Sequence, residues 1–106
     1  IIKFKNEYNI NVAMKNKKIV LIRKKLDKLD LKMLGLIKKR SILVNKILRE
    51  KKYKKQIIDK KRIKIILKKI KTESNKRNLD PKITNTIWKA MIRSFINYEF
   101  RNFKNK

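Results

Sequence analysis

The sequence predicts an all-α fold, a three-helix subunit with a long first helix, from three observations. Strand-type alternation of apolar and polar residues is nearly absent from the 106 residues. Apolar residues recur instead in steps of three and four, the spacing of one helix face. One Gly, one Pro and a hydrophobic content of 42% fit a small folded helical domain rather than a disordered tail.

The first helix is predicted from about Lys18 to Lys51, because no Pro interrupts it and its only glycine, Gly35, is isolated. At 1.5 Å per residue it would be about 50 Å long, whereas a globular monomer of this size has a radius of gyration near 13 Å. Its apolar stripe would extend beyond its own domain. We therefore expect a homodimer in which a second copy covers the stripe.

The chain begins with Ile rather than Met, so we expect the natural start at Met14. We interpret residues 1–17 as an N-terminal extension outside the fold. The helical domain is predicted to span residues 18–106.

Two further helices follow a polar, basic loop at residues 52–58. Asp59 is the predicted N-cap of a helix ending near Ser74. Asp80 before Pro81 predicts the start of a third helix, which continues through Glu99. The residues expected to face inward are Ile63, Ile66, Leu67 and Ile70 on the second helix and Ile83, Ile87, Trp88, Met91, Ile92, Phe95 and Ile96 on the third.

Composition excludes several classes of chemistry. Without Cys or His, the chain has no disulfide, no thiolate metal site and no Ser–His–Asp triad, and we expect neither a metal nor a cofactor. No apolar run approaches the roughly 18 residues that span a bilayer, and no signal peptide is evident. These observations predict a cytoplasmic protein without a membrane partner.

The net charge of +26 first suggests nucleic acid as a partner. However, Lys greatly outnumbers Arg, and Lys, Ile and Asn are raised together, as a strongly AT-biased genome would produce on any fold. We therefore interpret most lysines as a solvated surface and do not expect a nucleic-acid partner.

Three cations interrupt the apolar stripe of the first helix. A buried charge is costly unless it is paired, and no acidic residue on this face has the spacing to pair with Arg40 or Lys51. An anionic ligand would supply the partner; the alternative is interface charges or snorkelling surface residues. The stripe comprises Arg23, Leu26, Asp30, Met33, Ile37, Arg40, Val44, Ile47 and Lys51.

A second subunit would allow the two arginines to hold one small molecule. Arg23 and Arg40 are 17 positions apart, roughly 25 Å along a helix, so one subunit cannot hold a small molecule with both. If two antiparallel copies cross near Gly35, Arg23 of one arrives between Arg40 and Lys51 of the other. Each dimer would then have two equivalent sites.

Two other positions could carry chemistry. Asp59 and Arg62 lie one turn apart, which indicates either an N-cap with a local ion pair or an anion site at a helix start. Glu99 continues the inward face of the third helix, where it could donate a hydrogen bond if protonated or form an ion pair at the rim.

The order of these residues resembles the all-helical, type II chorismate mutases of the AroQ class, from about Ile22 to Phe100. The resemblance implies an intertwined, cofactor-free homodimer that converts chorismate to prephenate by a Claisen rearrangement. This isomerase step of the shikimate pathway leads toward phenylalanine and tyrosine. The matching segments are Arg23, Leu26-Asp27-Lys28-Leu29-Asp30, Lys38-Lys39-Arg40, Lys51, Asp59-Lys60-Lys61-Arg62, Leu79-Asp80-Pro81 and Ile87-Trp88-Lys89-Ala90-Met91-Ile92.

The resemblance also implies roles for the charged residues. Arg23 of the neighbouring subunit and Arg40 of the same subunit would clamp the two substrate carboxylates. Lys51 would donate to the ether oxygen whose bond to the ring breaks. Asp59 and Arg62 would orient the ring hydroxyl and support a carboxylate. Glu99 occupies the position of a Gln or Glu that contacts the same ether oxygen.

Two apolar residues depart from the family pattern at substrate-binding positions. Ile63 stands where the family often has a Glu that binds the ring hydroxyl, and Phe95 stands where a small polar residue is common. Both replacements resemble the isochorismate-pyruvate lyases, which share the fold. The lyase is therefore one alternative to the mutase, and a non-enzymatic basic helical module that binds nucleic acid is another.

Overall fold

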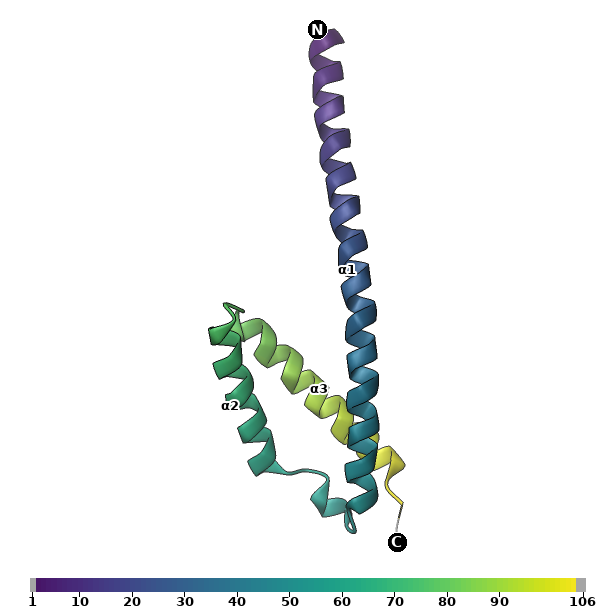
Figure 1. Ribbon diagram of the computed structural model, residues 1–106, viewed down its shortest axis with the longest axis vertical. Helices are drawn as coiled ribbons and strands as arrows, with labels where there is room; N and C mark the ends of the chain where they lie inside the picture. The colour runs from purple at the N-terminus through teal and green to yellow at the C-terminus, as the bar shows by residue number, and fades with distance from the viewer. Residues whose placement is uncertain (1, 105–106) are drawn as a thin grey trace. The chain divides into compact units, whose positions relative to one another are not determined.

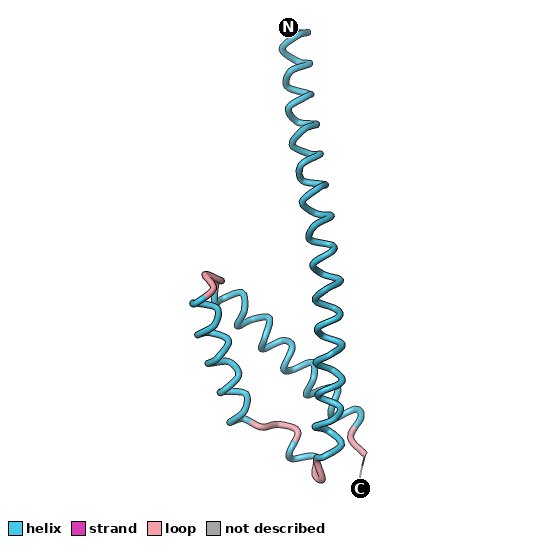
Figure 2. Tube along the Cα trace, viewed as in Figure 1, coloured by secondary structure: helices cyan, strands magenta, loops and turns pink. Residues whose placement is uncertain are grey.

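The computed structural model describes residues 2–104, with side chains from Val12 onward. All regular secondary structure in this range is helical (Figures 1 and 2). The three-helix, all-α prediction is therefore confirmed. The elements are α1 (Ile2–Glu50), a short 3-10 helix η1 (Lys54–Gln56), α2 (Lys60–Lys76) and α3 (Pro81–Asn102).

Helix α1 begins much earlier than the sequence pattern predicted. The predicted start at Lys18 was wrong, because the helix already begins at Ile2. The intervening stretch contains neither Gly nor Pro, so nothing in it ends a helix. The predicted end at Lys51 is correct to one residue, since α1 ends at Glu50.

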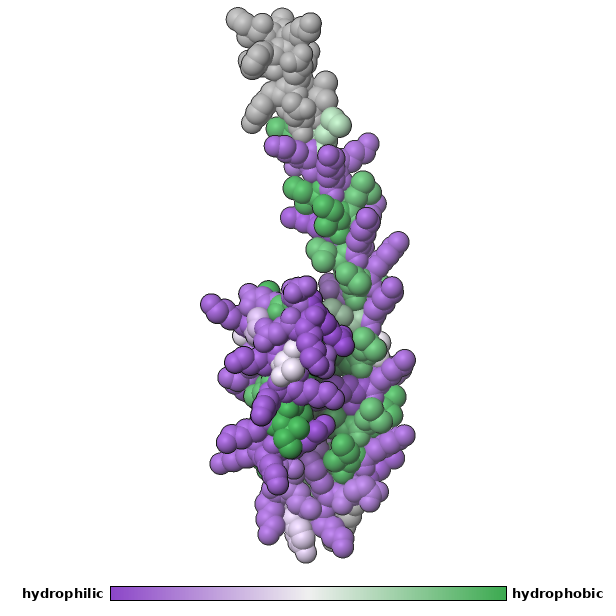
Figure 3. All heavy atoms as spheres, turned by 60° about the vertical axis from the view of Figure 1, so that its left-hand side comes forward, coloured by the Kyte–Doolittle hydropathy of each residue, from purple (hydrophilic) through white to green (hydrophobic). Residues whose placement is uncertain are grey.

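The chain forms two compact units, of which one runs to Arg40 and the other begins at Ser41. The first unit consists of a single helical segment, and every side chain described from Val12 to Lys39 is exposed. In Figure 3, hydrophobic groups alternate with hydrophilic ones along this helix. Its exposed large apolar residues include Val12, Met14, Ile19, Val20, Leu21, Ile22, Leu26, Leu29, Leu31, Met33, Leu34 and Leu36.

In the second unit, α2 and α3 pack against each other and are joined by a tight turn. Asn78 has a positive φ of 56°, a conformation that Asn tolerates better than most residues. The backbone N–H of Leu79 donates to the carbonyl of Ser74 at 2.9 Å. Beside the turn, the buried hydroxyls of Ser74 and Thr84 lie 2.7 Å apart in a hydrogen bond. This bond fixes the start of α3 against the end of α2.

The opposite end of α3 meets the end of α1 within the same unit. The Tyr98 hydroxyl donates to Asn45 Oδ1 at 2.8 Å across this contact. The buried apolar residues of the described chain, Leu48, Ile57 and Ile92, make up a small core. Two residues predicted to face inward, Ile83 and Ile87, are instead exposed in the single subunit, since the first half of α3 is covered on one side only by α2.

Both predicted helix caps are present. Asp59 accepts a hydrogen bond from the Arg62 backbone N–H, and Asp80 accepts one from Lys82, both at 2.9 Å. Helix α2 ends at Lys76, two residues beyond the predicted Ser74. No helix in the described residues is both long and apolar enough to cross a membrane.

Candidate active site

Lys51 and Glu99 form a largely buried ion pair at the junction of α1 and α3. The Lys51 Nζ donates to Glu99 Oε1 at 2.9 Å, and the two side chains are 17% and 8% exposed. The sequence offered Lys51 no acidic partner on its own helix face, and the structure supplies one from another helix. An ion pair for Glu99 was one of the two sequence-based interpretations, although it was expected at the rim rather than in a buried position.

The loop after Lys51 is ordered by one side chain that the sequence analysis missed. Gln56 Oε1 accepts hydrogen bonds from the backbone N–H groups of Lys52 and Tyr53, at 2.7 Å and 2.9 Å. The Lys55 ammonium lies 5.5 Å from the centre of the Tyr53 ring, a cation–π distance. The sequence contains only a weak signal for this arrangement, namely the polar, uncharged side chain of Gln56 within a basic segment. These contacts set the path of the chain from Lys51 to the start of α2.

An open hollow of about 600 Å³ lies where this loop passes Lys51. Both Lys51 and Asp59 line it. Three of its residues are cations and one is a carboxylate, which favours an anionic ligand. The lining residues are Lys51, Lys55, Gln56, Ile58, Asp59 and Lys60.

At the start of α2, Asp59 acts as the N-cap. Its Oδ1 accepts a hydrogen bond from the Arg62 backbone N–H, which confirms Asp59 as the predicted N-cap. The Arg62 residue is exposed, and Ile63, the next residue on the helix, is half-buried. On α3, Phe95 is half-buried one turn before Glu99.

The two predicted arginines of the clamp lie on α1 within the first compact unit. Arg23 is exposed, whereas Arg40 is half-buried. Because α1 is unbroken between them, their 17 positions correspond to roughly 25 Å along the axis. One small molecule therefore cannot contact both arginines of a single subunit.

A second contact that sequence reasoning missed supports the position of Glu99. Tyr98 precedes it on α3, and the Tyr98 hydroxyl reaches Asn45 across 53 sequence positions. No local pattern indicates a contact of this kind, because it depends on how α1 and α3 pack.

Among the described residues, no group of three or more His, Cys, Asp or Glu side chains could hold a metal ion.

Comparison with known families assigns the chain to one of them. The family described as chorismate mutase type II matches residues 22–100, most of the chain. The protein therefore belongs to that family, which is the all-helical AroQ class predicted from the sequence. No curated protein and no solved structure matches the chain significantly.

The Lys51–Glu99 pair should contribute more to stability than an exposed pair. Replacing Lys51 by Met leaves the Glu99 carboxylate buried without its partner, so we expect the free energy of unfolding in urea to fall by about 3 kcal/mol. The double variant Lys51→Met/Glu99→Leu should recover most of this loss, because it removes both charges.

The exposed pair of α2 provides the control. Arg77 Nε lies 3.7 Å from Glu73 Oε2, and the Arg77 side chain is 71% exposed. Arg77→Met should therefore cost less than about 1 kcal/mol. Equal losses for Lys51→Met and Arg77→Met would contradict a structural role for the buried pair.

Proposed function

We propose that this protein is a chorismate mutase, which rearranges chorismate to prephenate at the branch toward phenylalanine and tyrosine. The observation that carries the proposal is the family match over residues 22–100, which includes every residue nominated for the site. The lowest-numbered is Arg23 and the highest is Glu99.

A Claisen rearrangement suits the residues that are present. The reaction is pericyclic, so it requires no nucleophile, metal ion or proton transfer, and a protein without His or Cys can catalyse it. The protein has to hold a flexible dianion in its compact reactive conformer. It also has to stabilise the negative charge that develops on the ether oxygen with donors that are already in place.

Lys51 is the donor that we assign to the ether oxygen. An ammonium group has three N–H donors, and the contact with Glu99 uses one of them. Glu99 thus fixes the direction of the ammonium and leaves other donors for the substrate. The low exposure of both side chains strengthens these interactions, because water screens them less.

The arginines are assigned to the two carboxylates of the substrate. The planar guanidinium of Arg presents a fork of donors that matches a carboxylate better than the single ammonium of Lys. We propose that Arg40 binds one carboxylate and that Arg23 arrives from the partner subunit to bind the other. The long separation of the two along α1 supports this shared site.

At the start of α2, we assign Asp59 to the ring hydroxyl and Arg62 to support of a carboxylate. The N-cap hydrogen bond uses Oδ1 of Asp59. The second carboxylate oxygen is the acceptor that we assign to the hydroxyl. Asp59 also lines the hollow beside Lys51, which supports its place in the same site.

We further propose an intertwined, antiparallel homodimer. In the first unit, the Leu31 and Leu34 side chains are 68% and 60% exposed. They lie on a different side of α1 from Leu29, which is also exposed. A helix with apolar residues on several sides needs cover from several directions. A Cβ at Gly35 would meet nothing within 4 Å, so a second helix could approach closely there.

An isochorismate-pyruvate lyase on the same fold is the second candidate. The observation that favours it is the pair of apolar residues at substrate-binding positions. Ile63 cannot bind a ring hydroxyl, and Phe95 offers no polar group on α3 one turn from Glu99.

Turnover assays should separate the two activities. We expect the purified protein to convert chorismate to prephenate, identified by chromatography, and to leave isochorismate unchanged. Pyruvate and salicylate formed from isochorismate alone would identify the lyase. Turnover of neither substrate would contradict both assignments.

Subunit mixing should show whether the site is shared. Arg23→Ala and Arg40→Ala dimers should each be inactive. Co-expression of the two subunits should restore up to about one quarter of the wild-type activity, averaged over all sites, because of the two-fold symmetry of the dimer. Half of the dimers would then be mixed, with one site carrying neither substitution. Co-expression of Arg23→Ala with the Arg23→Ala/Arg40→Ala chain is the control and should restore nothing. Absence of recovery in proven mixed dimers would contradict the shared site.

Substitution of Gly35 should report on the helix crossing. In an uncovered helix, Gly35→Ala would stabilise the protein by up to about 1 kcal/mol, because Gly is a poor helix former. If a partner helix crosses there, Gly35→Leu should instead weaken the dimer at least about tenfold, through overpacking of the interface. Sedimentation equilibrium measures the dimer affinity. An unchanged or tighter Gly35→Leu dimer would place the crossing elsewhere.

A further inference from the structure

One face of α2 carries four exposed lysines, which we call the lysine row. They follow one another at intervals of four, four and three residues, so they lie on the same side of the helix. The row extends about 16 Å along the axis at 1.5 Å per residue. It consists of Lys60, Lys64, Lys68 and Lys71.

The residues at each end of the lysine row line a hollow. Lys60 lines the hollow that also contains Lys51 and Asp59. Lys68 and Lys71 line a second hollow, of about 470 Å³, between α2 and the start of α3. This outer hollow gains a further cation from Lys82, and its other lining residues are Leu67, Pro81 and Asn85. The row therefore connects an outer cationic hollow with the candidate active site.

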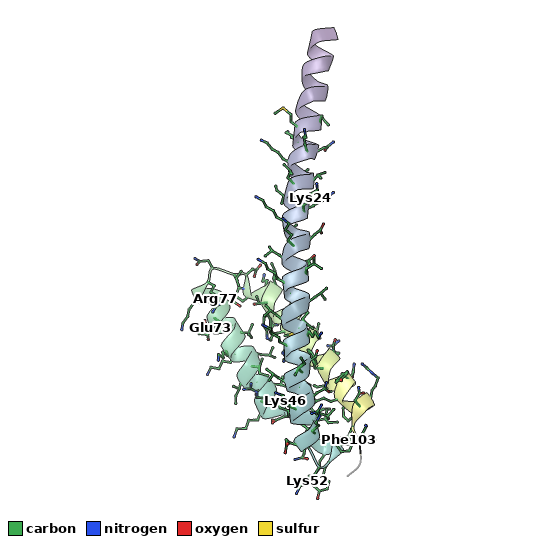
Figure 4. The ribbon with its side chains drawn as sticks, turned by 45° about the vertical axis from the view of Figure 1, so that its right-hand side comes forward. Lys24, Lys46, Lys52, Glu73, Arg77 and Phe103 are labelled. Atoms are coloured by element: carbon green, nitrogen blue, oxygen red, sulfur yellow. The ribbon has the colours of Figure 1, made fainter. Side chains whose placement is uncertain are left out.

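The charges of the row are not cancelled on α2 itself. The helix has one carboxylate, that of Glu73, which pairs with Arg77. Figure 4 shows this pair near the turn into α3, at the end of the unit away from Lys52. Among the described side chains, the ion pairs of this unit join Lys51 to Glu99 and Arg77 to Glu73, and neither uses a lysine of the row. In Figure 3, hydrophilic residues cover most of the surface over α2.

We propose that the outer hollow captures the dianionic substrate and that the lysine row guides it along α2 to the hollow at Lys51. This inference rests on the proposed function. Neighbouring lysines of the row are about one helical turn apart, roughly 5–6 Å, which is shorter than the Debye length of about 8 Å at physiological salt. A dianion leaving one ammonium is therefore already within the field of the next.

The type of cation suits guidance rather than tight binding. Lysine is a compact, strongly hydrated point charge, whereas the arginine fork grips a carboxylate in one geometry. A path made of lysines attracts an anion without holding it in a fixed position. The residues assigned to the final clamp, Arg23 and Arg40, are arginines. The row should thus raise the rate of encounter without entering the chemical step.

The test compares two triple variants that remove the same charge. The row variant is Lys64→Gln/Lys68→Gln/Lys71→Gln, which leaves the residues lining the Lys51 hollow intact. The control variant is Lys69→Gln/Lys76→Gln/Lys89→Gln, whose residues are also exposed but lie off the row on α2 and on α3. Both carry three fewer positive charges than the wild type.

The expected loss depends on salt. For the row variant, kcat/KM for chorismate should fall about tenfold at 0.01 M salt and about twofold at 0.15 M, because screening shortens the reach of the charges. The value of kcat should stay within about twofold, since the row does not contact the reacting atoms. The control variant should lose markedly less than the row variant at low salt. Equal losses in both variants, or a loss in the row variant that salt does not change, would overturn the proposal.

These assays distinguish a failure of this inference from a failure of the proposed function. If the wild-type protein turns over chorismate and the two variants behave alike, only the row is rejected. If the wild type does not turn over chorismate, the mutase is rejected, and equilibrium dialysis with chorismate at 0.01 M salt still tests capture. Weaker retention by the row variant than by the control would support the row, and equal retention would overturn it.

Discussion

The ion pair between Lys51 and Glu99 is the constraint on which the rest of the second unit depends. Two charges that leave water are costly apart and tolerable only together, so the end of α1 and the end of α3 have to meet at one point. The hydrogen bond from Tyr98 to Asn45 fixes the same two helices one residue away from Glu99. This junction also fixes the position of Lys51, which lines the hollow beside the start of α2.

The two units of the chain differ in how much of their apolar surface is buried. The second unit has a small core of its own, centred on residues such as Leu48 and Ile92, and it carries the hollow that favours anions. The first unit is a helical segment that exposes its apolar residues. The exposed apolar surface of the first unit needs a partner to cover it. In the proposed dimer, the same contact places Arg23 in the site of the other subunit. Assembly and the complete site would then be the same event.

Local signals predicted the second and third helices well. The caps at Asp59 and Asp80 act over three residues or fewer, so a short stretch of sequence contains the whole interaction. The start of α1 was missed, because residues 2–17 were excluded from the fold although they contain no Gly or Pro that would end the helix. The family resemblance also placed Lys51 and Glu99 at the same ether oxygen of the substrate, without predicting a direct contact between them. Their contact across 48 positions depends on the packing of α3 against α1, which residue spacing alone does not contain.

The side chain of Gln56 gives the segment between Lys51 and α2 an unusual kind of constraint. Its two hydrogen bonds to the backbone of Lys52 and Tyr53 close the chain around the 3-10 helix η1, and they fix the conformation of residues 52–56. The charges around it are exposed and can change in evolution with little structural effect. An insertion or deletion in this segment would instead shift Asp59 relative to Lys51, although neither helix would change. Natural variation here should therefore alter the chemistry of the loop far more readily than its length.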